Sequence, residues 1–295
     1  MVLLAPNGSY GNPVIVGNSV TITSGFLTLN TNELTINGTL NCAATLPPNP
    51  TGYIRSRASG ATLSRLNIAG SGSLGGSIFM DNTGLSTTAG VSRGSNAADD
   101  LTVLTPGVAN NLDRFTFNRP GQTITLGNEM QISGTVVPTA GILATGTAGS
   151  AISNLVMLST ATVTSSILAF PASGASISGN VNVQSYFTGG GYLVGRGFRM
   201  ISSPIVEVAL GNNFIQRMKQ RFIVTGRTGI AGSFDAGGTK QPNAITFRSY
   251  VEPAAAGNAS YTSPFNISDQ INIGQGYFFF FRGNRSNATT TKVAD

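Results

Sequence analysis

The chain has no histidine, no tryptophan and a single cysteine in 295 residues. Without histidine, Ser-His-Asp and Cys-His catalysis are excluded, and the commonest protein ligand of zinc, copper and non-haem iron is missing. The lone Cys42 excludes a disulfide within the chain and a metal site of several cysteines. No histidine or lysine flanks it, so we predict a buried apolar side chain. We expect no catalytic residue, no cofactor and no metal ion.

Charge is also scarce, at 9% of residues, against about a quarter in ordinary globular domains. The net charge of +6 comes from basic residues scattered along the chain. Nucleic-acid-binding proteins gather such residues on one face, whereas the densest group here is only Arg217, Lys219 and Arg221. No apolar run approaches the roughly 18 residues of a membrane-spanning helix. We therefore expect neither nucleic-acid binding nor membrane insertion.

The strongest positive signal is an internal repeat. Residues 32–40 (NELTINGTL) recur as residues 128–136 (NEMQISGTV) with the same alternation of apolar and polar positions. The core of the repeat, an isoleucine followed two residues later by glycine, occurs again at residues 68–70 and 177–179. One short strand-and-turn unit is thus used several times.

Apolar pairs between residues 20 and 36 follow one another at seven-residue spacing: Val20/Ile22, Leu27/Leu29 and Leu34/Ile36. Alternation within each pair predicts a short strand with one buried face. The residues between the pairs are Ser, Gly, Asn and Thr, which favour turns. This spacing favours a β-solenoid over ordinary hairpins, although Asn-Gly turns also suit hairpins in a sandwich.

The same pattern returns over residues 115–132, with corners predicted at residues 118–121 and 127–128, and it continues less regularly to residue 177. The proline-rich residues 46–52 cannot form a central strand. Residues 83–112 are rich in Gly, Ser, Thr and Asn and are predicted to be a long loop or insertion. We predict an all-β protein whose residues 1–180 form a β-solenoid.

Aromatic residues and charges become more frequent after residue 180, which predicts a second domain over residues 181–295. Glycine turns between longer alternating segments favour an antiparallel β-sandwich with at most one short helix. Within residues 213–222, three apolar residues recur at four-residue spacing and predict a helix packed on the sandwich. Strands are predicted at residues 181–186, 191–194, 198–201, 222–224, 245–251 and 271–281.

Five consecutive aromatic residues form the most apolar segment near the end of the chain: Tyr277, Phe278, Phe279, Phe280 and Phe281. A strand with this composition is either buried on both faces or covered by something outside the chain. We predict that it forms an interaction surface.

Two carboxylates facing each other across a groove would be needed for acid-base glycoside hydrolysis. The acidic residues of the predicted solenoid are Glu33, Asp81, Asp99, Asp100, Asp113 and Glu129. Glu33 and Glu129 occupy matching positions of the repeat, which favours a structural role at the corners of matching coils. We therefore predict a protein that is not an enzyme.

Residues 181–186 (VNVQSY), 197–204 (GFRMISSP), 273–277 (IGQGY) and 282–285 (RGNR) resemble a module of large surface and adhesin-like proteins that Bacteroidota export by the type IX secretion system. The chain differs at Ser185, where a basic residue is usual, and at Phe198, where tryptophan is frequent. The resemblance implies an extracellular location at the cell surface. It also implies a piece of a longer polypeptide, with the second domain incomplete at its C-terminal end.

These observations favour a non-enzymatic extracellular structural or adhesive protein, which could assemble into a filament or a surface layer. Its expected partners are further copies of itself, other surface proteins or glycans. One alternative is a protein that binds or processes carbohydrate along a solenoid groove, with Tyr53 or Phe117 stacking on sugar rings. Another is a viral or phage fibre protein, whose neutral polar β composition is similar.

Overall fold

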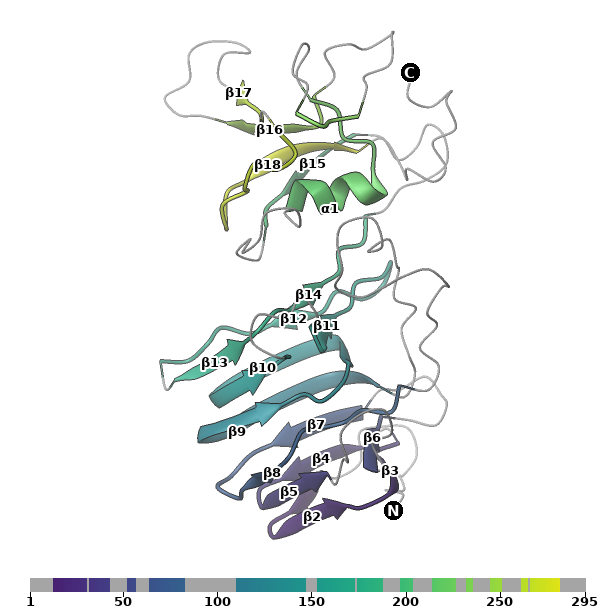
Figure 1. Cartoon of the computed structure of the whole chain (residues 1–295), viewed down its shortest axis with the longest axis vertical. Helices are drawn as coiled ribbons and strands as arrows, with labels where there is room; N and C mark the ends of the chain where they lie inside the picture. Colours follow the sequence, from purple (N-terminus) through teal and green to yellow (C-terminus); the bar gives the residue numbers. More distant parts are fainter. Residues whose placement is uncertain are drawn as a thin grey trace. The chain divides into compact units, whose positions relative to one another are not determined.

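In the residues that it describes, the computed structural model is almost entirely β, with one short helix (Figure 1). These residues fall into two compact units, and along the chain the boundary between the units lies between Tyr186 and Phe187. The structure describes residues 13–30, 32–42, 52–56, 64–82, 110–146, 153–172, 174–187, 197–203, 214–226, 232–235, 245–250, 261–264 and 266–281. Most of the loop predicted at residues 83–112, and most of residues 46–52, lie outside these ranges.

The largest sheet of the first unit is parallel throughout. Its strands in spatial order are β1 (Val14–Val16), β4 (Glu33–Ile36), β7 (Ser64–Ile68), β9 (Asn111–Thr125), β10 (Met130–Ala144), β11 (Leu155–Met157) and β14 (Asn182–Val183). Two further strands, β12 (Ser166–Ile167) and β13 (Ala175–Ser178), also pair with β10.

Two smaller parallel sheets complete the first unit. One contains β2 (Ser19–Ile22), β5 (Thr39–Cys42) and β8 (Leu74–Gly75), and the other contains β3 (Gly25–Thr28) and β6 (Gly52–Arg55). Over β1 to β8, each of these parallel pairs therefore joins two strands that are three positions apart along the chain: β1–β4, β2–β5, β3–β6, β4–β7 and β5–β8. Each of these strands has only two to five residues.

Inward-facing side chains of successive strands form columns in the core of the first unit. Leu34 is in register with Leu66, Leu66 with Phe115, and Phe115 with Val136. All four side chains are buried and belong to one hydrophobic cluster. The predicted alternation of Leu34 and Ile36 is confirmed, because both are buried while their neighbours in β4 are not.

The glycine of the repeat lies where neighbouring backbones approach closely. A Cβ atom at Gly38 would overlap the backbone carbonyl of Asn18, and a Cβ atom at Gly134 would overlap that of Asp113. Only glycine avoids this overlap without a backbone shift.

The two copies of the repeat do not occupy matching positions in the sheet. Glu33 is in register with Arg65, Arg65 with Arg114, and Arg114 with Thr135. Thr135, and not Glu129, therefore matches Glu33 in the sheet, and it lies six residues after Glu129 (129 to 135). Glu129 lies before the first residue of β10 and is buried. The prediction that Glu33 and Glu129 are equivalent corner residues is therefore wrong, because sequence similarity did not set the pairing register.

The second unit contains one antiparallel sheet, in the order β15 (Gly197–Ile201), β18 (Tyr277–Phe281), β16 (Phe247–Tyr250) and β17 (Tyr261–Thr262). The predicted helix is confirmed as α1 (Phe214–Arg221), and its Ile215 and Met218 pack in one cluster with Phe247 and Phe279. Among the described residues of this unit, the element packed on the sheet is thus a helix.

The strand predictions for the second unit succeed in part. The predicted strand at residues 198–201 matches β15, and those at residues 245–251 and 271–281 shorten to β16 and β18. The one at residues 181–186 shortens to the two-residue β14, residues 222–224 form no strand, and residues 191–194 lie outside the described residues.

Candidate functional site

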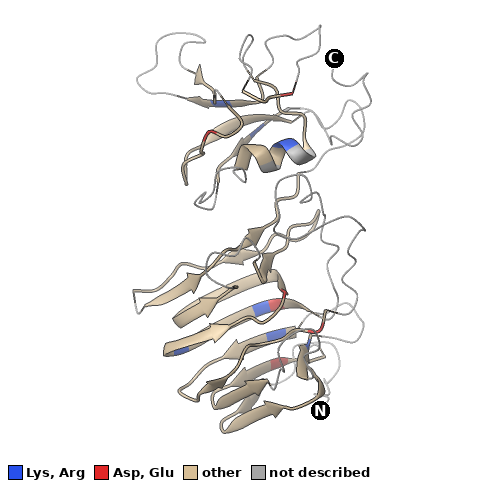
Figure 2. Ribbon diagram, viewed as in Figure 1, with Lys and Arg blue, Asp and Glu red and all other residues tan. Residues whose placement is uncertain are grey.

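Most of the described charged residues of the first unit lie on three neighbouring strands of the parallel sheet, β4, β7 and β9 (Figure 2). Their positions alternate with the buried positions of these strands, so they face outward. We call this group the polar ladder and define it by its five residues, which are Glu33 of β4, Arg65 and Asn67 of β7, and Asp113 and Arg114 of β9.

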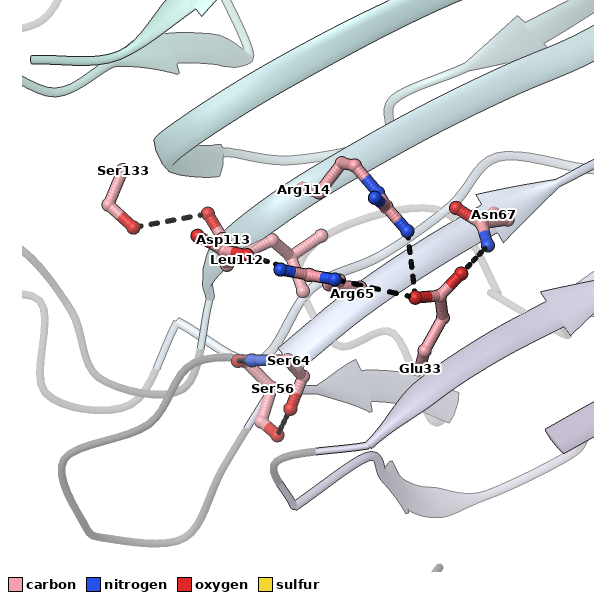
Figure 3. A network of polar contacts seen from close by, with 9 residues as sticks. All are labelled: Glu33, Ser56, Ser64, Arg65, Asn67, Leu112, Asp113, Arg114 and Ser133. Atoms are coloured by element: carbon pink, nitrogen blue, oxygen red, sulfur yellow. Dashed lines mark hydrogen bonds and ion pairs between the residues drawn. The ribbon is translucent and has the colours of Figure 1, made fainter. Parts of the chain in front are cut away.

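The carboxylate of Glu33 is the centre of the polar ladder (Figure 3). Nη2 of Arg114 donates a hydrogen bond of 2.7 Å to its Oε2, and Nη1 of Arg65 lies 3.8 Å from the same oxygen. Nδ2 of Asn67 donates to its Oε1 at 2.7 Å. Nε of Arg65 donates to Oδ2 of Asp113 at 2.8 Å, so Arg65 joins the two carboxylates.

An irregularity in β9 brings Asp113 into the polar ladder. Ser64 is in register with Leu112, but Arg65 is in register with Arg114, so Asp113 is an extra residue between them. A bulge of this kind redirects a side chain that regular alternation would place on the other face. Asp113 and Arg114 can therefore both lie on the outer face and contact the same neighbour.

The polar ladder is neutral overall and only partly open to solvent. Its four charged side chains, two acidic and two basic, are 18–32% exposed. Oδ1 of Asn67 and Nε of Arg114 are buried and have no hydrogen-bond partner. Each carboxylate contacts a guanidinium and the two share Arg65, which is an arrangement that stabilises pairing between strands. The carboxylates do not face each other across an open groove.

The predicted interaction strand is divided between two faces of its sheet. Tyr277, Phe279 and Phe281 of β18 are buried in the hydrophobic cluster of the second unit, whereas Phe278 and Phe280 point to the opposite face and are half-buried. An interaction role for this segment is thus limited to Phe278 and Phe280.

The two aromatic residues proposed to stack on sugar rings differ in accessibility. Phe117 is fully buried and is in register with Ile68 of the core, so that prediction is wrong for Phe117. Tyr53 is half-buried and stacks on Phe26 with ring centroids 5.6 Å apart. The guanidinium of Arg55 lies 3.7 Å from the ring centroid of Phe26 and its Nε donates to Asp81.

Sequence reasoning missed a fully buried arginine. Arg119 donates hydrogen bonds to the backbone carbonyls of Ile36, Gly38 and Gly72, which belong to two earlier passes of the chain. Burial lowers the pKa of its guanidinium. Among the described residues, no carboxylate pairs with it. The sequence signal was weak, because Arg119 lies in a predicted corner, which the structure shows as a break in the pairing of β9 between Asn118 and Thr123.

Cys42 is buried, as predicted, and burial raises the pKa of its thiol to about 11. The described residues contain no group of three or more side chains that could hold a metal ion. They also contain no helix long and apolar enough to cross a membrane. No family model matches the chain, and neither the curated proteins nor the solved structures include a match.

Proposed function

We propose that the chain is a non-enzymatic structural or adhesive protein of the bacterial cell surface, with a β-solenoid over residues 1–180 and a β-sandwich-like domain over residues 181–295. The observation that carries this proposal is the parallel pairing of strands three positions apart along the chain from β1 to β8. The acidic and basic side chains of the polar ladder, which lies on this sheet, bind one another. In solenoid proteins, repeated units that contact only their neighbours stack into extended scaffolds, and this pairing pattern supports such an arrangement.

The extracellular location rests on the resemblance of residues 181–285 to modules of proteins exported by the type IX secretion system. In this proposal the chain is part of such a secreted protein and contributes to a filament or a surface layer. The low charge and the neutral polar surface suit contact with other surface proteins or glycans, which are the proposed partners.

A structural role is favoured over catalysis by the state of three acidic residues of the first unit, whereas Asp99 and Asp100 lie outside the described residues. Glu33 and Asp113 share Arg65, and Asp81 is bound by Arg55. A glycosidase needs one carboxyl group free to donate a proton and a second one free to attack or activate water. These carboxylates instead fix neighbouring strands to one another.

Carbohydrate binding is a second candidate, favoured by the outward-facing Phe26 and Tyr53 of the β3–β6 sheet. Phe26 is 40% exposed, and aromatic rings of this kind can cover the apolar face of a sugar. A glycan array decides between the candidates: binding that is lost in Tyr53→Ala would favour this one.

The proposed function is tested on the organism that encodes the chain. Antibodies against the purified chain should label intact cells, and beads coated with the chain should adhere to those cells or to their surface extract. Labelling only after permeabilisation would contradict the surface location. Release of reducing sugar from a polysaccharide panel by the purified chain would contradict the non-enzymatic role.

A further inference from the structure

The antiparallel sheet of the second unit has one face that packs in the core and one that carries exposed aromatic residues. We call the second one the aromatic face and define it by seven residues: Phe198 and Met200 of β15, Phe278 and Phe280 of β18, Arg248 and Tyr250 of β16, and Tyr261 of β17.

The pairing register shows that these side chains share one face. Phe198 is opposite Phe280 and Met200 is opposite Phe278. Phe278 is also opposite Arg248, which extends the face to the next strand. Tyr250, two residues after Arg248, is opposite Tyr261 and extends it to β17.

The aromatic face is open to solvent at its two edges. Phe198 and Met200 on one edge strand are 57% and 77% exposed, and Tyr250 and Tyr261 at the other edge are 47% and 37% exposed. Ring centroids are 5.0 Å apart for Phe198 and Phe280, and 5.7 Å apart for Tyr250 and Tyr261. Contiguous exposed apolar patches of this kind mark binding surfaces.

The residue types of the aromatic face are those of a protein interface. Phe, Tyr, Met and Arg are enriched in interface cores, whereas Lys, Glu, Asp, Ser and Ala are depleted there, and all seven residues of the face belong to the enriched types. The described residues of these four strands place no acidic side chain among them. The face is therefore suited to a protein surface of similar composition.

We propose that the aromatic face binds the same face of a second copy of the chain, with the two sheets stacked face to face about 10 Å apart as in a β-sandwich. From their exposed fractions, Phe198, Met200, Tyr250 and Tyr261 offer about 440 Å² per copy, taking about 200 Å² for each side chain, and the three half-buried residues add to this area. About 1,000 Å² in the pair is close to the lower limit for a specific interface, so the association is weak and concentration-dependent.

Arg248 favours a second copy over an acidic partner. It is the one charged residue among the seven of the aromatic face, so an acidic partner would meet a single complementary charge. The nearest aromatic residues on the same face are Tyr250 of its own strand and Phe278 of the next strand. In a two-fold pair, the guanidinium of one copy can lie over a tyrosine ring of the other, which needs no carboxylate. This proposal deepens the self-assembly included under the proposed function and rests on it.

Sedimentation velocity of the full chain from about 1 μM to about 1 mM tests the proposal. We expect a reversible monomer–dimer equilibrium, with the dissociation constant raised at least tenfold in the double variant Phe198→Ser/Met200→Ser. The matched control is Leu168→Ser/Phe170→Ser, which changes two residues of the first unit with 49% and 48% exposure and should leave the equilibrium unchanged. Unaltered far-ultraviolet circular dichroism establishes that the variants are folded.

A chain that stays monomeric at every concentration overturns the proposal, as does equal weakening of the dimer by both double variants. Tyr250→Ser provides a second test at the opposite edge of the face, where weaker dimerisation is again expected. Cell-surface labelling and bead adhesion separate this proposal from the proposed function: a monomer that adheres refutes only the face-to-face pairing, and a dimer found only inside cells refutes only the surface role.

Discussion

Glu33 and Arg114 are two strands apart in the parallel sheet, yet Oε2 of Glu33 and Nη2 of Arg114 are 2.7 Å apart. Arg114 extends across Arg65, which lies in register with both residues. Placing two arginines opposite each other would be unfavourable by itself, so the carboxylates of Glu33 and Asp113 compensate the positive charge.

A double-mutant cycle on Glu33→Gln and Arg114→Gln measures this contact. We expect a coupling free energy of about 1 kcal/mol at low salt that decreases as salt is added, because both side chains are partly exposed. Unfolding in urea followed by circular dichroism is suitable, since the chain has no tryptophan. A coupling that does not respond to salt would contradict the ionic origin of the contact.

The glycine of the repeat should tolerate no side chain. Gly38→Ala is expected to lower the free energy of unfolding by more than about 2 kcal/mol, because its Cβ atom would overlap the backbone at Asn18. Gly17→Ala is the matched control, since a Cβ atom there meets nothing within 4 Å. Equal effects of the two changes in urea unfolding would show that close backbone approach is not the reason for the glycine.

Arg119 should be more important for stability than its sequence context indicates. Arg119→Met keeps most of the side-chain volume but leaves the carbonyls of Ile36, Gly38 and Gly72 without this donor. We expect a loss of about 3 kcal/mol in the free energy of unfolding. The partly exposed Arg114, changed to Met, should lose less than about 1 kcal/mol. Chemical denaturation of both variants is the measurement, and similar losses would count against the buried contact.

The buried thiol of Cys42 makes stability depend on alkaline pH. Its pKa is about 11 in the folded chain, whereas an unperturbed thiol has a pKa near about 8.5 to 9. The folded state therefore holds its proton where the unfolded state has lost it. This contribution is complete below about pH 8.5 and decreases as pH rises towards 11, by about 2 to 3 kcal/mol.

Urea unfolding at several alkaline pH values, compared between the native chain and Cys42→Ala, isolates this term from tyrosine ionisation. The native chain should lose stability more steeply with pH than the variant. Parallel pH dependences would show that Cys42 is not responsible. A thiol reagent at neutral pH should likewise react only after unfolding.

The two faces of β18 predict opposite sensitivities to truncation. Phe279→Ala should destabilise the second unit by about 3 to 5 kcal/mol, because Phe279 is fully buried and its ring is 5.2 Å from that of Phe247. Phe280→Ala, on the aromatic face, should cost much less. Thermal unfolding followed by circular dichroism compares the two variants, and equal losses would indicate that both faces are covered.

Local patterning predicted the short strands well. Leu34 and Ile36 are buried as the two-residue alternation requires, and four-residue spacing predicted α1. Leu27 and Leu29 are also buried, but so is Thr28 between them. These signals are local, because side-chain direction is fixed within a strand or a helical turn. The composition of β18 indicated an unusual strand, although the sequence could not tell which of its rings would be buried.

Register and long-range contacts were not predictable. The repeat suggested that Glu33 and Glu129 are equivalent, but the position of Glu129 depends on how many residues separate β4 from β10 and on the irregularities between them. The extra residue Asp113 moves the pairing by one position. Arg119 donates hydrogen bonds to backbone carbonyls that lie 47 or more positions earlier in the chain. Contacts of this kind follow from the pairing of strands that are far apart in the sequence and leave no local pattern.

The fifteen-residue strand β10 pairs along one edge with three short strands in turn, β11, β12 and β13. Each of these three short strands pairs with β10 and with neither of the other two, so its register is set by β10. The connection between β11 and β12 closes on itself through the antiparallel bridge between Ser159 and Thr164, so residues at its tip can be added without moving any other strand. This tip is a natural position for grafting a foreign epitope or a tag into the chain.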